Sequence, residues 1–342
     1  MNDILNALDL SYDELNEICI TQWDLPRYRA DQISQWIYAK KVFDFSEMTN
    51  LSKELRKEMV NRIMVLPPYE IKRQVSEKDG TTKYLWGMND GETIESVVLF
   101  HGNHTTACIS TQVGCPLRCL FCATGKTGFA RNLATSEITG QFLSMEKNIG
   151  RDINNIVFMG MGEPLLNLEN VKKSIRILNH PKMRNLGIRH FTVSTAGIVP
   201  GIRDLADSEL PVRLSVSLHA PNNDIRNRIM PVNREYPLNR LMEALEYYQD
   251  ITGERITIEY IMLKNINDQP EHAYELVSLL GNLRTYINLI PYNPVDSVFE
   301  RSPAKQVKEF YSILSSLGCE VETRTEKGTD IDAACGQLRR KT

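Results

Sequence analysis

Apolar positions in the first 68 residues recur with the period of an α-helix. The helical segments that this pattern predicts are 12–19, 29–42 and 52–64. In the second of them Ile33, Trp36 and Ile37 share one face, and Pro67 and Pro68 end the helical region. We therefore expect a small helical accessory domain over residues 1–68. Its basic residues, which could contact an anionic partner or simply form a solvated helix face, are Lys40, Lys41, Lys53, Arg56 and Lys57.

The pattern changes between Tyr69 and Phe100, where apolar and polar residues alternate. The alternating runs are 69–76, 81–88 and 93–100. The pairs Asp79-Gly80 and Asp90-Gly91 lie between these runs, and such a pair between two alternating runs is a strong signal for a hairpin turn. Residues 69–100 are thus predicted to form a β-hairpin extension that links the helical domain to the core.

From residue 101 to residue 325, segments typical of strands and of helices take turns. The strand segments are 105–113, 153–161, 189–195, 212–219, 255–263, 285–293 and 319–325, and the helical segments include 135–147, 168–179, 238–251, 270–281 and 302–318. Nearly continuous apolar strands that alternate with helices indicate a parallel sheet. Six βα units precede the final helix and strand, which is fewer than a closed barrel has.

We therefore expect an α/β fold whose core, residues 101–325, is a partial (βα)6 barrel. A doubly wound open sheet is the alternative. Residues 326–342 form a separate C-terminal segment in this division of the chain. In either architecture the chemistry belongs at the carboxyl ends of the strands.

Unusual polar and small residues do follow the predicted strands. The three cysteines of the stretch 115–122 come after the first strand of the core, and the residues that follow the later strands are Gly162 and Glu163, Ser194, Ser217 to His219, and Asn293. Polar groups at the ends of several parallel strands converge on one mouth. The pattern thus predicts a composite site there.

Cys115, Cys119 and Cys122 are spaced closely enough to form one soft-metal site. Thiolates select zinc, copper(I) or iron–sulfur clusters. A cubane cluster held by three cysteines keeps one iron open for chemistry. A structural zinc site is the alternative, although such sites usually close with a fourth Cys or His at short spacing, and the nearest downstream histidine is His180.

Composition narrows the class of protein without identifying it. The chain has 342 residues, 42% hydrophobic and 24% charged, with a net charge of −3, which fits a globular enzyme and does not by itself indicate nucleic-acid binding. Seven cysteines, an odd number in a long chain, argue against a disulfide framework and for a reducing compartment. No apolar run is long enough for a membrane span, and the acidic start lacks signal-peptide features. We expect a soluble, cytoplasmic protein that does not contact a membrane.

These features together resemble the RlmN/Cfr family of radical S-adenosylmethionine (SAM) enzymes. The three-cysteine loop with Phe121 before its last cysteine resembles the superfamily as a whole. The motifs that narrow the resemblance are Cys108 seven residues upstream, Gly160-Met-Gly-Glu-Pro, Ser217-Leu-His-Ala-Pro-Asn and Asp330-Ile-Asp-Ala-Ala-Cys335-Gly-Gln-Leu. The resemblance extends along the whole chain, including the helical N-terminal part.

The resemblance implies a cofactor set and a role for each candidate residue. Cys115, Cys119 and Cys122 would hold a [4Fe–4S] cluster, and two SAM molecules would be used per turnover. The residues implied to bind SAM are Gly162, Glu163, Ser194, Ser217, Leu218, His219 and Asn293. Cys335 would accept a methyl group, Cys108 would resolve the protein–RNA adduct by forming a disulfide with Cys335, and Glu95 would act as a general base. Cys19 and Cys319 have no counterpart role and are expected to be buried.

The implied reaction is methylation of C2 of adenosine in 23S rRNA, in the peptidyl-transferase region, and in tRNA beside the anticodon. The implied partners are these RNAs and a reductant such as a flavodoxin or ferredoxin system, and the protein is expected to be a monomer. Cations near the mouth that could contact phosphates are Arg118, Lys126, Arg131, Arg184, Arg189, Arg226, Arg228, Arg234 and Arg339 to Lys341.

Two other functions stay open at this point. A Cfr-like enzyme that methylates C8 of adenosine shares the cluster and both reactive cysteines, although the loops 112–114, 163–167 and 219–222 look like the C2 type. A non-enzymatic iron–sulfur or zinc module would explain three cysteines but would leave Cys108 and Cys335 without a purpose.

Overall fold

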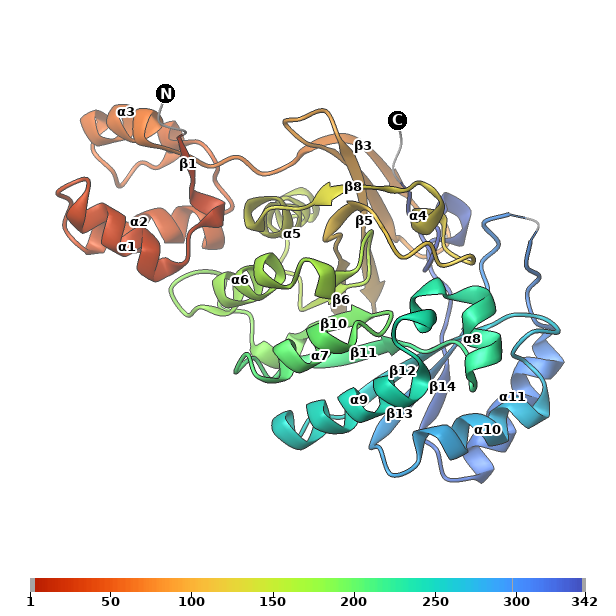
Figure 1. Cartoon of the computed structure of the whole chain (residues 1–342). Helices are drawn as coiled ribbons and strands as arrows, with labels where there is room; N and C mark the ends of the chain where they lie inside the picture. The colour runs from red at the N-terminus through yellow and green to blue at the C-terminus, as the bar shows by residue number, and fades with distance from the viewer. Residues whose placement is uncertain (1–3, 297, 340–342) are drawn as a thin grey trace.

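The computed structural model of the chain describes residues 4–296 and 298–339, and its largest feature is one ten-stranded sheet (Figure 1). Across the sheet the strand order is β14-β13-β12-β11-β10-β9-β6-β5-β4-β3. The strands are β3 (Tyr69–Val75), β4 (Thr82–Gly87), β5 (Thr93–His101), β6 (His104–Cys108), β9 (Asn155–Phe158), β10 (Phe191–Thr195), β11 (Arg213–Ser217), β12 (Ile256–Met262), β13 (Thr285–Pro291) and β14 (Val321–Thr323). The predicted α/β class is confirmed.

The strands β6, β9, β10, β11, β12, β13 and β14 of this sheet are parallel and follow one another in chain order. The helices that connect them are α5 (Thr135–Ile149), α6 (Leu168–Asn179), α7 (Val199–Ala206), α8 (Asn223–Ile229), α9 (Leu238–Thr252), α10 (Pro270–Leu280) and α11 (Ala304–Ser316). A doubly wound sheet would reverse its strand order at a switch point, whereas sequential right-handed crossovers place all helices on one face. The sequential order is thus that of a partial barrel with six βα units and a final strand.

Alternation within each strand decides which residues form the core. Val193, Leu214, Ile258 and Ile287 are fully buried residues of four neighbouring strands. The helices contribute fully buried residues such as Phe142 to the same core. Each such side chain contributes about 1.5–3 kcal/mol relative to its exposed state.

The strands β3, β4 and β5 are antiparallel to one another, and β5 pairs with β6, again antiparallel. The predicted hairpin extension is therefore a continuation of the core sheet. Through this pairing Val97 of β5 lies opposite Cys108 of β6. The register places the extension directly beside the first strand of the parallel part.

The N-terminal residues form helices α1 (Tyr12–Thr21), α2 (Tyr28–Ser34) and α3 (Lys53–Arg62), which lie at one side of the sheet (Figure 1). Two short strands, β1 (Leu5–Asn6) and β2 (Ile63–Met64), pair where this region begins and ends. Asp9 accepts a 2.6 Å hydrogen bond from the Ser136 backbone N–H at the start of α5, and the Tyr12 ring stacks on His180. These contacts fix the helical part to the outer helices of the core.

The first predicted core strand, 105–113, is shorter in the structure. β6 ends at Cys108, and Gln112–Gly114 form β7, which pairs with β8 (Phe129–Asn132) in a separate two-stranded sheet. Between β6 and β7 the Ser110 backbone N–H donates to Gln141 and the Thr111 N–H donates to the Met161 carbonyl, so these groups bond outside the sheet ladder. This departure from the sheet is where the three-cysteine loop begins.

None of the helices within the described residues combines the length and the apolar character needed to cross a membrane.

Candidate active site

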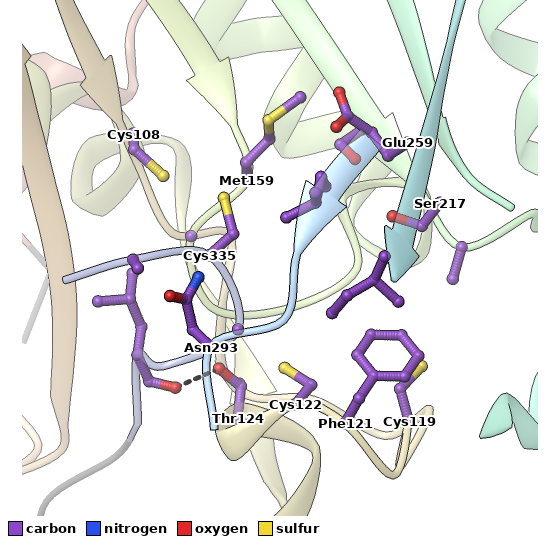
Figure 2. Close-up of a pocket in the computed structure, with 18 of the residues that line it drawn as sticks. Cys108, Cys119, Phe121, Cys122, Thr124, Met159, Ser217, Glu259, Asn293 and Cys335 are labelled. Carbon is purple, nitrogen blue, oxygen red and sulfur yellow. Dashed lines mark hydrogen bonds between the residues drawn. The ribbon is translucent and has the colours of Figure 1, made fainter. Parts of the chain in front are cut away.

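One cavity lies at the carboxyl ends of the parallel strands, and most of the predicted site residues line it (Figure 2). Those that line it are Cys108, Cys115, Cys119, Cys122, Gly162, Glu163, Ser194, Ser217, His219, Asn293 and Cys335. Glu95 and Leu218 are not among its lining residues in the part of the chain that the structure describes. Residues that are spread over more than two hundred positions of sequence thus meet in one place.

The three-cysteine loop has a backbone that requires glycine at its start. Gly114 has φ +78°, and a Cβ there would lie 1.8 Å from the Gly128 carbonyl oxygen. The Cys115 N–H donates to that same carbonyl over 2.9 Å. At the other end of the loop, a Cβ on Gly125 would come within 3.0 Å of the Cys119 backbone. Close backbone packing therefore fixes the path of the loop.

The donor set of this loop fits an iron–sulfur cluster. Cys115, Cys119 and Cys122 are free thiols that line one cavity, and three thiolates leave one iron of a cubane open. Burial raises the pKa of Cys119 well above its ordinary value, with further contributions from Cys122 and Cys115, so metal binding must displace protons there. Across the described residues, no three His, Cys, Asp or Glu side chains gather as ligands of a single metal ion.

Gly162 and Glu163 form the tight turn after β9. Gly162 has φ +105°, and a Cβ on it would lie 2.6 Å from Gln112 Cβ. The Glu163 carboxylate accepts hydrogen bonds from the backbone N–H groups of Ala196 (2.8 Å) and Leu165 (3.1 Å). Burial raises the pKa of Glu163 to about 7, although these hydrogen bonds oppose the rise. An ammonium group in the cavity would favour the charged carboxylate.

His219, after β11, is held as a neutral ring. Its backbone has φ +58°, and its Nδ1 accepts a 3.1 Å hydrogen bond from the Ile261 N–H, so the proton of the neutral ring is assigned to Nε2. Burial, with the neighbouring Arg226 charge, lowers the pKa of His219 to about 3. The ring meets Phe121 edge to face at 4.8 Å. His219 thus joins the strand end to the cysteine loop.

Leu218 lies between Ser217 and His219, which line the cavity, but its own side chain does not line it in the described part of the chain. Its side chain is fully buried in the core, and its carbonyl accepts a 3.1 Å hydrogen bond from Arg226 Nε. The described contacts therefore place Leu218 in the scaffold of the strand end.

Cys108 and Cys335 form a second group of thiols at another part of the cavity, away from Cys119 and Cys122 (Figure 2). Cys108 ends β6, while Cys335 lies in the irregular C-terminal segment, and both are free thiols. Burial raises the pKa of Cys108 to about 12, and the nearby Cys335 contributes to this rise. The structure thus brings the two distant cysteines of the sequence motifs together.

Sequence reasoning missed two charged residues of the cavity, Glu259 on β12 and Arg324 after β14. Glu259 Oε1 accepts from Ser215 (3.0 Å) and Asn288 (3.1 Å), and its Oε2 lies 3.9 Å from Arg324 Nη1. The charge of Arg324 opposes the rise in the Cys108 pKa. A carboxylate inside the apolar strand 255–263 is the signal that could have identified Glu259.

The expectation that Arg184, Arg189 and Arg226 contact phosphates near the mouth is wrong. Arg226 is fully buried, and it donates to the carbonyls of Ala196 and Ser217 at the ends of two strands. Arg184 and Arg189 precede β10 and so lie at the amino edge of the sheet, opposite the cavity. Arg184 also makes a bidentate pair with the Glu146 carboxylate.

Other candidate cations are paired or exposed. Lys126 pairs with Asp296, Arg131 with Asp90 and Glu137, Lys41 with Asp152 and Glu146, and Arg339 lies 3.9 Å from Asp332. Arg118, Arg228 and Arg234 are exposed on the cysteine loop and around α8. Arg340 and Lys341 lie outside the described residues.

The two cysteines without an expected role differ from each other. Cys19 is fully buried in α1, as expected. Cys319 is only partly buried, because it follows α11 at the surface, which corrects the expectation that it is a core residue.

Comparison with known proteins gives consistent matches. Residues 5–65 match the ribosomal RNA large subunit methyltransferase N-terminal domain, and residues 109–277 match the radical SAM superfamily. Proteins named probable dual-specificity RNA methyltransferase RlmN from Thermotoga neapolitana and Thermosipho melanesiensis are 52% and 53% identical to the chain, over 98% of both chains in each case. The crystal structure of a radical SAM methyltransferase from Sphaerobacter thermophilus is similar with a TM-score of 0.94 and 40% identity, covering 98% of this chain and 99% of that one.

Proposed function

The chain belongs to the RlmN family of the radical SAM superfamily, and from this premise we propose that it is an RNA methyltransferase that methylates C2 of adenosine. The proposed substrates are 23S rRNA and tRNA. One observation carries the proposal beyond the family name: Cys108 and Cys335 line the same cavity as the three-cysteine loop. A cluster protein without this reaction has no need for two further thiols there.

The cysteine loop and the strand ends divide the cofactor binding between them. Cys115, Cys119 and Cys122 would hold a [4Fe–4S] cluster. When bound, the cluster would supply the electron that cleaves SAM to methionine and a radical that can take a hydrogen atom from a methyl group. Glu163 offers a buried carboxylate to the SAM ammonium group, and charge-assisted hydrogen bonds of this kind are strong.

The remaining strand ends offer neutral polar groups. Ser194, Ser217 and Asn293 line the cavity, and they suit the ribose and adenine of SAM because hydroxyl and amide groups can both donate and accept. His219 presents an apolar ring with a polar Nε2 edge. We therefore assign these four side chains to SAM binding.

Cys335 and Cys108 act on the substrate in sequence. Cys335 as a thiolate takes a methyl group from one SAM, which leaves as S-adenosylhomocysteine. After this carbon has been joined to C2 of adenine, the adduct loses the C2 proton to Cys108 and loses one electron, which the bound cluster would accept. Once the Cys108 thiol has released this proton to solvent, its thiolate attacks the Cys335 sulfur. An S–S bond forms, the C–S bond breaks, and its electron pair stays on the carbon, which gains a proton and becomes the methyl group. An external reductant with two electrons must then reduce the disulfide.

The target base has to leave its stack so that its C2 can reach Cys335. Extrusion costs a few kcal/mol and is easiest in loops and bulges. The exposed cations Arg118, Arg228 and Arg234, beside the cysteine loop, are the described residues that we expect to contact phosphates.

The decisive test is to identify the methylated base. The reconstituted protein, a reductant and SAM are incubated with unmodified 23S rRNA fragments and separately with tRNA, and the digested nucleosides are identified by mass spectrometry. We expect 2-methyladenosine from both RNAs. Formation of 8-methyladenosine alone would replace the C2 proposal by the C8 reaction, and SAM cleavage without any modified base would refute the proposed substrate.

Metal analysis of the anaerobically purified protein tests the cofactor. About four irons and four sulfides per chain are expected for a cubane cluster. Stoichiometric zinc in their place would support a structural module and contradict the enzymatic proposal.

A further inference from the structure

The segment that carries Cys335 lies against the extension β3–β5 and is held there by polar contacts. Asp79, between β3 and β4, accepts a 2.9 Å hydrogen bond from the Gly328 N–H, and Asp330 accepts a 2.7 Å hydrogen bond from the Ser76 hydroxyl. Farther along the extension, Lys327 Nζ donates to the Phe100 carbonyl over 2.7 Å. The segment is thus attached to the extension at several points ahead of Cys335.

Two buried charges of the extension hold the part of the segment nearest to Cys335. Lys83 on β4 is 4% exposed, Glu95 on β5 is 1% exposed, and Lys83 Nζ lies 3.6 Å from Glu95 Oε1. Lys83 Nζ also donates to the Asp332 carbonyl over 3.1 Å, and Glu95 Oε2 accepts from the Arg339 N–H over 3.0 Å. The ion pair therefore contacts the chain three residues before Cys335 and four residues after it.

The opposite side of this loop is held by the cysteine loop. The Ala123 N–H donates to the Gly336 carbonyl over 2.7 Å. The Thr124 hydroxyl donates to the Leu338 carbonyl over 2.5 Å, the bond drawn as a dashed line at Thr124 in Figure 2. The loop around Cys335 thus lies between the Lys83–Glu95 pair and the residues that follow Cys122.

A buried ion pair is weak evidence for a role in stability, because the cost of removing both charges from water offsets their attraction. Neither Lys83 nor Glu95 lines the cavity among the described residues, and the hydrogen bonds described above go to the backbone of the C-terminal segment. Their position favours an effect on the reaction through the loop.

We propose that Lys83 and Glu95 are positioning residues, which as a buried ion pair hold the loop of Cys335 at the cavity. The proposal deepens the proposed function and rests on it, because it gives Glu95 the task of fixing the methyl-accepting cysteine instead of taking a proton. A loop held at two points keeps the thiol aimed at the cavity through two successive reactions, with SAM and with the base.

The first test measures the loop without RNA or SAM. The reduced holoenzyme and its Lys83→Met variant are treated with iodoacetamide, and the alkylation rates of Cys335 and of Cys319, the internal reference, are measured by peptide mass spectrometry. Loss of one ordinary hydrogen bond predicts a rise of about fivefold in Cys335 alkylation, with faster hydrogen exchange over 326–339 and no change at Cys319. The matched control is Lys72→Met, an exposed lysine of the adjacent strand β3.

A single substitution removes only one charge of the buried ion pair, so the double variant Lys83→Met/Glu95→Gln is measured beside it. Iron content and circular dichroism identify variants that hold a cluster and fold. Unchanged Cys335 alkylation and exchange in the folded variants would overturn the proposal. Because these measurements need no RNA, they remain valid even if the RNA substrate is not the proposed one.

A second measurement separates positioning from proton transfer. Glu95→Gln keeps an acceptor for the Arg339 N–H, whereas Glu95→Ala does not. We expect the Glu95→Gln variant to retain most of the single-turnover rate of methyl transfer to Cys335, and the Glu95→Ala variant to lose about a hundredfold of that rate. The KM for SAM and reductive SAM cleavage should be unchanged in both variants. The proposal would fail if Glu95→Gln lost as much RNA methylation as Glu95→Ala while hydrogen exchange over residues 326–339 stayed as in the wild-type protein. Glu95 would then be a proton acceptor.

Discussion

The two groups of thiols in the cavity are built in opposite ways. Cys115, Cys119 and Cys122 lie within eight residues of one another, on a loop shaped by its own glycines and backbone hydrogen bonds. Cys108 and Cys335 come from a core strand and from the C-terminal segment, and the sheet together with its antiparallel extension brings them to one place. The first group is local in sequence, and the second exists only in the folded chain.

This difference suggests separate roles for the two groups of thiols. In the proposed function, the three-thiol loop would hold the cluster, and Cys108 and Cys335 would determine what the radical acts on. Substitutions in the two groups should therefore fail at different steps, and the predictions below test that separation in order of decreasing effect.

The largest effect is expected from removing one thiol of each group. Cys119→Ala should abolish SAM cleavage and RNA methylation together, because the cluster loses a ligand. Cys335→Ala should abolish methylation, by at least about a thousandfold, while reductive SAM cleavage continues. Both activities are followed by chromatography of 5′-deoxyadenosine and by nucleoside mass spectrometry. Equal loss of SAM cleavage in both variants would contradict the expectation that the two groups of thiols act at different steps.

Cys108→Ala should stop the reaction one step later. Without the resolving thiol, the Cys335–RNA bond is not cleaved, so a covalent protein–RNA adduct should accumulate while turnover falls about a hundredfold or more. The adduct is detected as a shifted band on a denaturing gel. Cys319→Ala, a partly buried thiol outside the cavity, is the control and should turn over normally; normal turnover of Cys108→Ala would contradict the role of the pair.

Substitutions at two glycines test the three-cysteine loop without replacing a thiol. Gly114→Ala places a Cβ 1.8 Å from the Gly128 carbonyl, whereas Gly128→Ala has a similar positive φ (+76°) but no atom within 4 Å. Gly128→Ala should cost only the strain of a left-handed residue, about 1–2 kcal/mol, while Gly114→Ala should also lose cluster occupancy. Iron content after reconstitution distinguishes them, and equal iron in both variants would show that the loop tolerates the displaced backbone.

A substitution of Arg226 tests the strand ends that surround the cavity. Arg226→Met leaves buried carbonyls at two strand ends without their donor, which should lower the free energy of unfolding by about 3 kcal/mol. Arg228→Met, two residues along the same helix and exposed, should change it by less than about 0.5 kcal/mol. Denaturant unfolding of both variants gives the comparison, and similar stabilities would contradict a structural role for Arg226.

The smallest effect concerns the attachment of the C-terminal segment. Burial alone would raise the pKa of Asp79, but hydrogen bonds from Thr81, Gly328 and Ser76 outweigh it and lower the pKa to about 2. A carboxyl with a depressed folded-state pKa stabilises the fold above its ordinary pKa and loses this effect as the pH falls toward 2. The stability advantage over Asp79→Asn should therefore shrink between about pH 5 and pH 2, as measured by thermal unfolding. A constant difference would contradict this linkage.

Much of the architecture could be predicted because it follows from local pattern. Apolar periodicity identified the parallel strands and the connecting helices, and the Asp-Gly pairs identified the turns of the extension. The strand 105–113 was predicted too long because the β-branched residues Ile109, Thr111 and Val113 continue its pattern past Cys108. Only the hydrogen bonds of this stretch to Gln141 and Met161 show the departure from the sheet. The boundaries at residues 68, 100 and 325 remain a prediction.

The candidate cations show where sequence reasoning stops. An arginine in a sequence carries the same charge whether it is exposed, like Arg228, or fully buried on backbone carbonyls, like Arg226. Likewise, Glu259 and Arg324 join the cavity only because β12 and β14 end beside it. The surroundings of a side chain depend on neighbours that are distant in sequence.

By itself the sequence determined the three-thiol loop and the order of strands and helices, because spacing and periodicity act over a few residues. Only the tertiary structure decided that Cys108 meets Cys335 and that the Lys83–Glu95 pair contacts the chain on both sides of Cys335. Contacts of that range depend on strand register and on the path of the C-terminal segment. Both are fixed by burial and hydrogen bonding across the whole molecule.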